Sequence, residues 1–368
     1  MDKFGRRKDA SKPRALTRNA GCQSGNHGGG VDEHGHSFEH QFSGHWPREV
    51  WQDVPILMAV SGGVDSVALL RAICSLKPAH ASGVTVAHFN HRWRGADSDA
   101  DADFVVELSR QMGIPCEVGT ADANLAHCVG GLEERGRRAR YAFLQETAER
   151  LGARYVATAH TADDQAETIL HHILRGTGPR GLAGMRRVRP LGPAVTLVRP
   201  LLTVRRATLA EYLNDMGQPF REDTTNSDLR FRRARIRHEL LPLLSRQYNA
   251  DVVGALLRLG RLTAETRGAI EQLASTLGER VVTRQDDRQI ELMAVPLATE
   301  PRYLVREVLI SLWRTARWPL KSMGYREWEA LADIVARCAR AEPVRPQVFP
   351  GNVTVTAEAG RVRLVRDA

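Results

Sequence analysis

Six residues near position 60 have the types and spacing of a turn that holds phosphate groups. Ser61, Gly62, Gly63, Val64, Asp65 and Ser66 follow the apolar run at 56–60 and precede a helical pattern that begins near Val67. Two glycines let the backbone turn tightly and approach a ligand, and the free amides at a helix start point at an anion. No lysine follows the glycines, so this is not a Walker A loop. A structural glycine turn with Ser66 as an ordinary N-cap is the alternative.

A second set of polar residues begins the helix predicted at 163–175. On this helix an apolar stripe is formed by Ala166, Ile169, Leu170 and Ile173. The polar residues away from that stripe are Asp163, Asp164, Glu167 and His171. Asp164 and Glu167, three residues apart, can present two carboxylates to one cation. A solvated acidic first turn, favoured by the helix dipole, is the alternative.

Alternating strands and helices are needed to bring these two sets together. Short apolar runs lie at 56–60, 83–89, 116–120 and 155–160. Segments with helical spacing follow them at 67–76, 97–112, 133–151 and 163–175. This alternation predicts an α/β fold with a doubly wound parallel sheet covered on both faces. Ligands of such sheets bind at the carboxyl ends of the strands, which is where both polar sets lie.

The chain is long enough to bury more than one core, with 368 residues of which 42% are hydrophobic. Residues 1–46 are rich in Gly, Ser, His and charge, which predicts a disordered extension; its histidines are candidates for metal binding, with a solvated tail as the alternative. Residues 47–245 form the predicted catalytic domain. Helical spacing at 251–277, 301–317 and 324–340 and a β-hairpin at 353–357 with 361–365 predict a mostly helical region over 246–368.

A net charge of +9 and a pI near 9.7 indicate a polyanionic partner. A dense basic segment contains Arg230, Arg232, Arg233, Arg235 and Arg237. So many arginines repel one another unless phosphates or carboxylates lie nearby, and Glu222 and Asp223 are candidates for part of that balance. A merely solvated basic loop is the alternative.

The sequence shows neither a membrane or signal segment nor paired cysteines, which bears on the location of the protein and on the state of its thiols. No apolar stretch is long enough to span a bilayer, and no apolar signal core follows the basic start, so we expect a cytoplasmic protein. The cysteines, which form no CxxC or CxxH pair, are Cys22, Cys74, Cys116, Cys128 and Cys338. Neither a disulfide framework nor a zinc site is predicted, and the oligomeric state cannot be read.

The turn Ser61–Ser66 resembles that of the PP-loop ATP pyrophosphatases, which cleave ATP between its α- and β-phosphates. Four further stretches make residues 55–244 similar to the tRNA(Ile)-lysidine synthetases. They are AHFNHRWRG (87–95), RARYAFL (138–144), ATAHTADDQAETILHHILRGTGPRGLAGM (157–185) and EDTTNSDLRFRRARIRHELLPLL (222–244). The region beyond Tyr248 is similar to that family's tRNA-binding part only weakly, and longer members carry a further C-terminal domain for which little room remains here.

The resemblance implies a complete reaction. Such enzymes adenylylate the C2 oxygen of the wobble cytidine in a CAU-anticodon tRNA(Ile), and the ε-amine of free L-lysine then displaces AMP. Residues Ser61–Ser66 would bind ATP, with Asp65 also holding Mg²⁺. Asp164 and Glu167 would bind lysine, and Arg140 would contact the activated base or its phosphate. The side chains that would line the site are His160 and Asp163, whereas His88 and His91 are open between a site and a structural role.

Other classes of PP-loop protein are alternatives to this reading. A tRNA thiolase needs cysteines for sulfur transfer, for which Cys116 and Cys128 are the candidates. An amidotransferase needs a glutaminase domain with a nucleophilic cysteine, and Cys22 lies in the predicted extension. A non-catalytic RNA-binding module with ATP as a structural ligand leaves Arg140 and the acidic pair unexplained.

Overall fold

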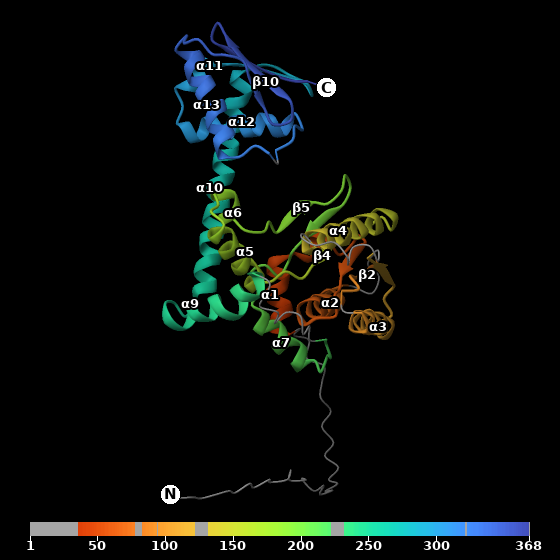
Figure 1. Cartoon of the computed structure of the whole chain (residues 1–368). Helices are drawn as coiled ribbons and strands as arrows, with labels where there is room; N and C mark the ends of the chain where they lie inside the picture. The colour runs from red at the N-terminus through yellow and green to blue at the C-terminus, as the bar shows by residue number, and fades with distance from the viewer. Residues whose placement is uncertain are drawn as a thin grey trace, which may run out of the picture. The chain divides into compact units, whose positions relative to one another are not determined.

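The structure is a computed structural model, which describes residues 36–77, 83–93, 95–121, 132–221, 232–320 and 322–367 (Figure 1). Most of the predicted extension therefore lies outside the described residues. The same holds for Cys22, Cys128, and residues 222–231, which include Glu222, Asp223 and Arg230. Within the described part of the chain, every helix is too short or too polar to cross a membrane.

A six-stranded sheet positions the predicted site. In spatial order its strands are β3 (Cys116–Thr120), β2 (Val84–Asn90), β1 (Ile56–Ala59), β4 (Tyr155–Thr158), β6 (Thr196–Val198) and β5 (Val188–Pro190). Neighbouring strands are parallel except for the antiparallel pair β5–β6 at the edge. The predicted α/β class with a doubly wound parallel sheet is confirmed. The short pair β5–β6 was not predicted.

Helices cover both faces of this sheet. They include α2 (Val64–Leu76), α3 (Ala96–Gln111), α4 (Leu132–Arg150), α5 (Ala162–Leu174), α6 (Pro179–Leu182) and α7 (Arg206–Asp215). Successive residues of a strand point to opposite faces. Ile56 and Met58 of β1 pack with α2, α3 and α7, whereas Leu57 packs with α4. Because both faces of the central strands are apolar and covered, polar chemistry is confined to the strand ends.

An unpredicted helix, α1 (Ser37–His45), precedes the sheet and is followed by the 3₁₀ turn η1 (Arg48–Val50). Phe38, Phe42 and Trp46 are buried in the same core as β1 and α2. The hydroxyl of Tyr212 on α7 donates to the buried carboxylate of Glu39 at 2.7 Å. The expectation of disorder is therefore wrong for residues 37–46, because three apolar residues spaced four apart give this segment a face to bury.

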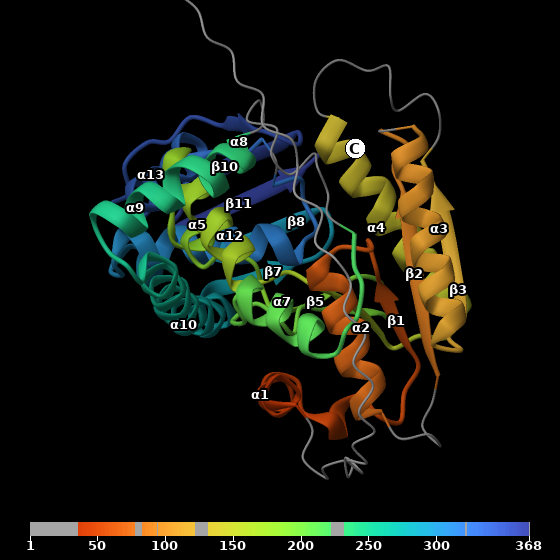
Figure 2. The same cartoon turned by 90° about the horizontal axis from the view of Figure 1, so that it is seen from below.

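The second half begins with three consecutive helical segments. These are α8 (Arg232–Arg235), the π-helical segment η4 (Ile236–Leu240) and α9 (Leu241–Gln247). The 30-residue helix α10 (Val252–Val281) follows. The buried apolar stripe of α5, with Ala166 and Ile169, packs against η4, α9 and α10. In both views α5 lies beside α9 and α10 (Figure 1, Figure 2). Ile173, also predicted in that stripe, is exposed because α5 ends at the next residue.

The C-terminal part combines helices with a second sheet. Its helices are α11 (Ala294–Ala298), α12 (Arg302–Thr315) and α13 (Tyr325–Ala339). Its five antiparallel strands are, in spatial order, β7 (Val282–Gln285), β8 (Gln289–Met293), β11 (Arg361–Arg366), β10 (Val353–Glu358) and β9 (Gln347–Phe349). The predicted hairpin is confirmed as β10–β11. It is the centre of a larger sheet, because β8 pairs with the free edge of β11 and β9 with that of β10.

Candidate active site

The turn between β1 and α2 has the geometry of an anion cradle. Gly62 has φ +92°, and a Cβ at this position would lie 3.3 Å from the ring of Phe104. Gly63 is the N-cap residue of α2, so the first amides of this helix have no intrahelical partner. The buried Ser66 hydroxyl accepts from the Ser61 amide at 3.2 Å and donates to the Gly63 carbonyl at 3.0 Å. Ser66 thus braces the turn, which leaves the backbone N–H groups to face an anion.

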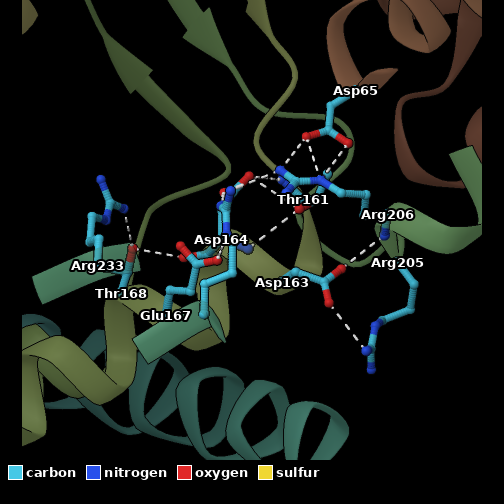
Figure 3. Close-up of polar contacts among 10 residues, drawn as sticks. Asp65, Thr161, Asp163, Asp164, Glu167, Thr168, Arg205, Arg206 and Arg233 are labelled. Carbon is cyan, nitrogen blue, oxygen red and sulfur yellow. Dashed lines mark hydrogen bonds and ion pairs between the residues drawn. The ribbon is translucent and has the colours of Figure 1, made fainter. Parts of the chain in front are cut away.

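Asp65 projects from this turn and pairs with Arg206, the first residue of α7. The Nε atom of Arg206 lies 3.1 and 3.0 Å from the two carboxylate oxygens (Figure 3). Burial raises the pKa of Asp65, and the Arg206 guanidinium opposes this rise. Arg206 is a site residue that sequence reasoning missed. It lies 141 positions from its partner, and no local motif marks it.

The first turn of α5 is organised by a capping box. The amide and the hydroxyl of Thr161 donate to Oδ2 of Asp164 at 2.9 and 3.1 Å, and the Thr161 hydroxyl accepts from the Asp164 amide. Asp163 accepts from the Arg206 amide at 2.8 Å and pairs with Arg205 at 3.1 Å (Figure 3). These bonds fix both carboxylates at the carboxyl end of β4, where the strand and helix pattern placed them.

Glu167 lies one turn further along α5 and is almost completely buried, with 2% of its surface exposed. Its Oε1 accepts from Nε of Arg237 at 2.5 Å, and the same guanidinium donates to Oδ1 of Asp164 at 3.0 Å. Burial raises the pKa of Glu167, and Arg237 opposes it. For Asp164, burial is outweighed by the bond from Thr161 and by neighbouring cations, so its pKa is lowered. The alternative of a solvated acidic turn is therefore wrong.

Arg237 explains part of the basic segment. Arg233 donates to the Thr168 hydroxyl at 2.9 Å, and Arg235 pairs with Glu239 at 3.5 Å. The predicted need for nearby carboxylates is thus met for Arg235 and Arg237, by residues of η4 and α5. Glu222 and Asp223, the carboxylates named for this balance, lie outside the described residues.

His160 connects the acidic turn to a group of arginines. It follows β4, and its Nδ1 atom lies 3.1 Å from the Thr158 hydroxyl. Burial lowers the pKa of His160 to about 3, with Asp164 opposing and Arg199 and Arg140 adding to the decrease. The imidazole is therefore neutral at physiological pH. It is close enough to Asp164 of α5, to Arg140 of α4 and to Arg199 after β6 for all three charges to act on its pKa.

The two histidines left open lie at the end of β2. His88 is buried, and its Nδ1 atom lies 2.9 Å from the Val60 carbonyl, which requires a proton on that nitrogen. His91 stacks on Trp93 with ring centroids 4.5 Å apart. Burial and then Arg140 lower its pKa to about 4. These contacts show His88 bracing the strand end, whereas His91 borders the surface around Arg140.

A divalent cation bound together with phosphates fits this donor set. Asp65 and Asp164 both face the Arg206 guanidinium, which lies 3.8 Å from Asp164. Among the described residues no cluster of three or more side chains could enclose a metal ion. Mg²⁺ uses one or two carboxylates and completes its shell with waters and substrate phosphates, so its chemistry needs no such cluster.

Comparison with known proteins gives matches over most of the chain. The model of the PP-loop domain family matches residues 38–244. The tRNA(Ile)-lysidine synthase of Rhodopirellula baltica is 34% identical over 326 residues, which are 79% of this chain and 82% of that protein. The tRNA(Ile)-lysidine synthase of Thermosynechococcus vestitus is 39% identical over 251 residues, 68% of this chain and 71% of that protein.

One solved structure supports the fold independently of these sequences. The U34-tRNA thiolase NcsA of Methanococcus maripaludis, solved with its [4Fe-4S] cluster, aligns with a TM-score of 0.52. The alignment covers 61% of this chain and 78% of the thiolase at 14% identity. The likeness therefore concerns the fold alone.

Proposed function

This chain belongs to the tRNA(Ile)-lysidine synthase family and has its PP-loop domain, and from this premise we propose how its site performs the reaction. The protein is an ATP-using ligase that modifies tRNA(Ile). In our proposal the C2 oxygen of the wobble cytidine of a CAU anticodon attacks the α-phosphate of ATP and releases pyrophosphate. The ε-amine of L-lysine then attacks C2, and the former C2 oxygen leaves with AMP. Lysidine results, and the codon read changes from AUG to AUA.

The turn Ser61–Ser66 is the proposed binding site of the ATP phosphates. Its glycines and free helix amides support this role, because they bind anions without needing a side-chain charge. Asp65 would hold Mg²⁺ bound to the phosphates, and the ion would neutralise charge on the departing pyrophosphate. Arg206 pairs with Asp65 and also lies near Asp164. If Asp65 binds Mg²⁺ instead of Arg206, the guanidinium therefore keeps Asp164 as an acidic partner.

Asp164 and Glu167 are the proposed acceptors of the lysine ammonium. The observation that carries this role is the position of both carboxylates at the strand end, with Glu167 buried and the side chain of Asp164 only 16% exposed, because a desolvated acidic pair strongly favours a cation. Arg237 supplies one such cation, and each carboxylate keeps lone pairs for a second donor. His160 and Asp163 line this site. Arg140 would stabilise negative charge on the phosphate of the adenylylated base.

A labelled substrate tests the reaction directly. The chain would be incubated with ATP, Mg²⁺, L-lysine and a CAU-anticodon tRNA(Ile) transcript carrying ¹⁸O at C2 of the wobble cytidine. We expect a nucleoside heavier than cytidine by lysine less water, and ¹⁸O in AMP. A product that forms without lysine and requires a sulfur donor would contradict the proposal and support a thiolase. Burial raises the pKa of Cys116, the one described candidate for thiolase chemistry, which disfavours a reactive thiolate.

Two further variants separate the roles of the carboxylates. Asp65→Asn should abolish AMP formation and leave tRNA binding intact. Glu167→Gln should raise the lysine concentration needed for turnover roughly thirtyfold or more, since losing one partner of a desolvated charge pair costs about 2–5 kcal/mol. Single-turnover formation of the AMP–tRNA adduct should stay near normal in Glu167→Gln. Loss of the adduct with an unaltered lysine requirement would assign Glu167 to ATP or metal binding instead.

The remaining proposals follow from the substrates. We propose a cytoplasmic location, which the use of tRNA and ATP as substrates supports. Residues 47–245 are the proposed catalytic domain, extended at its start by α1, and residues 246–368 the proposed tRNA-binding region. Asp65, with Asp164 nearby, is the proposed metal position.

A further inference from the structure

Four arginines surround the side chain of Tyr141, a residue of α4 with no assigned role. The guanidinium carbons of Arg137, Arg140 and Arg189 lie 5.3, 5.4 and 4.9 Å from the centre of its ring. An Nη atom of Arg199 donates to its hydroxyl at 3.4 Å. Three separate elements therefore direct cations at one phenol: α4, β5 and the segment after β6.

The charge of this cluster is not balanced within the described chain. No carboxylate among the described residues forms an ion pair with any of these four arginines. Arg199 is 3% exposed, and the polar acceptors it contacts are the Tyr141 hydroxyl and the Arg186 carbonyl, the latter at 2.7 Å. The Nε atoms of both Arg140 and Arg199 are buried and find no hydrogen-bond partner in the part of the chain that the structure describes. Burying a cation is costly unless it is paired, so these two buried donors point to an anionic ligand.

The paired arginines of the active site provide the contrast. Arg206 and Arg237 each contact carboxylates within hydrogen-bond distance, so the protein's own acidic residues satisfy them. Arg233, which lies close enough to Arg140 to lower its pKa, adds positive charge on that side. The unbalanced charge is thus concentrated on the surface around Tyr141.

This surface borders the proposed reaction centre but differs from the phosphate turn. Arg199 directly follows β6, and the first half of α4 lies at the same carboxyl edge of the sheet, because α4 runs back toward the start of β4. Arg199 and Arg140 both act on the pKa of His160. The ATP phosphates already have an anion cradle at the start of α2. A second anion site near His160, built from other residues than that turn, suits a different phosphate group.

We propose that Arg137, Arg140, Arg189 and Arg199, arranged around Tyr141, bind a backbone phosphodiester of the tRNA beside the nucleotide that is modified, with the donors of Arg140 shared between this phosphodiester and the phosphate of the adenylylated base. This proposal deepens the proposed function and rests on tRNA being the substrate. Guanidinium groups match phosphate oxygens with paired N–H donors, and a phosphodiester supplies the missing acceptors at the buried edge of the cluster. Such an interaction positions the RNA and reads no base, so the choice of nucleotide depends on other groups.

Tyr141 gives the site a built-in reporter. Although burial opposes it, Arg137, Arg140 and Arg199 stabilise the phenolate and lower the pKa of Tyr141 to about 8. A phosphate bound among the same arginines cancels part of this positive field. The pKa of Tyr141 should therefore rise toward its ordinary value when RNA binds.

The first test measures tRNA binding as a function of salt in the full chain. Arg137→Gln and Arg189→Gln are the test variants. Arg138→Gln is the matched control, since Arg138 is the next residue of α4 and pairs with Glu134 at 3.2 Å. Removing one arginine–phosphate ion pair should reduce the slope of log K against log salt by about 0.7–0.9, which is roughly a threefold change between 50 and 200 mM salt. The control should keep the parental slope.

The second test follows the ionisation of Tyr141 by ultraviolet absorbance, with Tyr141→Phe defining its share. An anticodon stem-loop RNA should raise this pKa, and ATP with Mg²⁺ should leave it unchanged. Equal salt slopes for the test and control variants, or an unchanged Tyr141 pKa with RNA bound, would overturn the proposal. Weaker ATP binding with an unaltered tRNA slope would overturn it too, by assigning the cluster to the nucleotide. Neither test depends on lysidine formation, so their failure is distinguishable from failure of the proposed function.

Discussion

Removing Arg237 should lower the stability of the fold, because Asp164 and Glu167 then lose the cation that neutralises them. Arg237 is 22% exposed and neutralises Glu167, whose side chain is 3% exposed, and Asp164 at 16%. Arg237→Gln leaves these carboxylates desolvated without their cation. Breaking a buried pair by removal of one partner costs about 3–5 kcal/mol. Arg235→Gln is the matched control, because it removes an arginine two positions away whose partner Glu239 is half exposed, and exposed pairs contribute about 0.2–1 kcal/mol.

The pH dependence of this loss identifies its cause. Burial already raises the pKa of Glu167, and loss of Arg237 should raise it further. A carboxyl whose pKa is higher in the folded than in the unfolded protein destabilises the fold when ionised, so this penalty is relieved as pH falls through the raised pKa. In urea unfolding, Arg237→Gln should therefore show its full decrease in the free energy of unfolding near pH 8 and a smaller decrease near pH 5.

A second substitution tests whether Glu167 is the residue responsible. The double variant Arg237→Gln with Glu167→Gln should recover most of the stability lost near pH 8, because a neutral amide replaces the unpaired charge. Equal losses of stability in Arg237→Gln and Arg235→Gln at both pH values, with no recovery in the double variant, would show that Arg237 does not neutralise a buried charge on Glu167.

Three smaller changes test packing elsewhere in the chain. Gly136→Ala places a Cβ against the ring of Trp93 and should displace that ring from His91, so its effect on indole fluorescence should vanish in a Trp93→Phe background. Gly268→Ala lies within α10 with nothing within 4 Å of the added Cβ, so it should stabilise the chain by about 0.5–1 kcal/mol in thermal unfolding. Tyr212→Phe leaves the buried Glu39 without the Tyr212 hydroxyl and should lower the free energy of unfolding by about 1–3 kcal/mol in urea, whereas an unchanged stability would show that this hydrogen bond does not help to hold α1 on the core.

The sequence pattern predicted the strand-to-helix boundaries that carry the candidate site, because each boundary depends on a short local segment. The phosphate turn and the carboxylates of α5 each lie where a buried strand meets a helix, and both boundaries are marked by glycine, threonine or aspartate. Parallel strands bring such boundaries to one edge of a sheet. The sequence therefore predicted the proximity of Asp65 and Asp164, which share the Arg206 guanidinium.

The pairing of distant residues could not be predicted in the same way. Glu167 and Arg237 lie 70 positions apart, and Arg237 on sequence alone is one of several arginines in a basic run. Which arginine turns inward is decided by the packing of η4 on α5. Arg199 has a weak signal in the sequence, because a charged residue directly after the β-branched and apolar segment 195–198 marks the carboxyl end of a strand. Helix α1 was missed because average composition concealed the regular spacing of Phe38, Phe42 and Trp46.

Because α10 is a continuous helix, the contacts at its two ends depend on the number of residues between them, which would not hold for a loop. Gly260 in its first half packs against Ile169 of α5, and Ala274 in its second half belongs to the core of the C-terminal part. One residue inserted between these points turns everything beyond it by about 100° and advances it by about 1.5 Å. Seven inserted residues nearly restore the angle but add about 10 Å of reach. The number of residues between these two contacts therefore sets both their separation along the helix and the angle between them around its axis. Any change in the length of α10 must add or remove nearly whole turns if both contacts are to stay on the same faces of the helix.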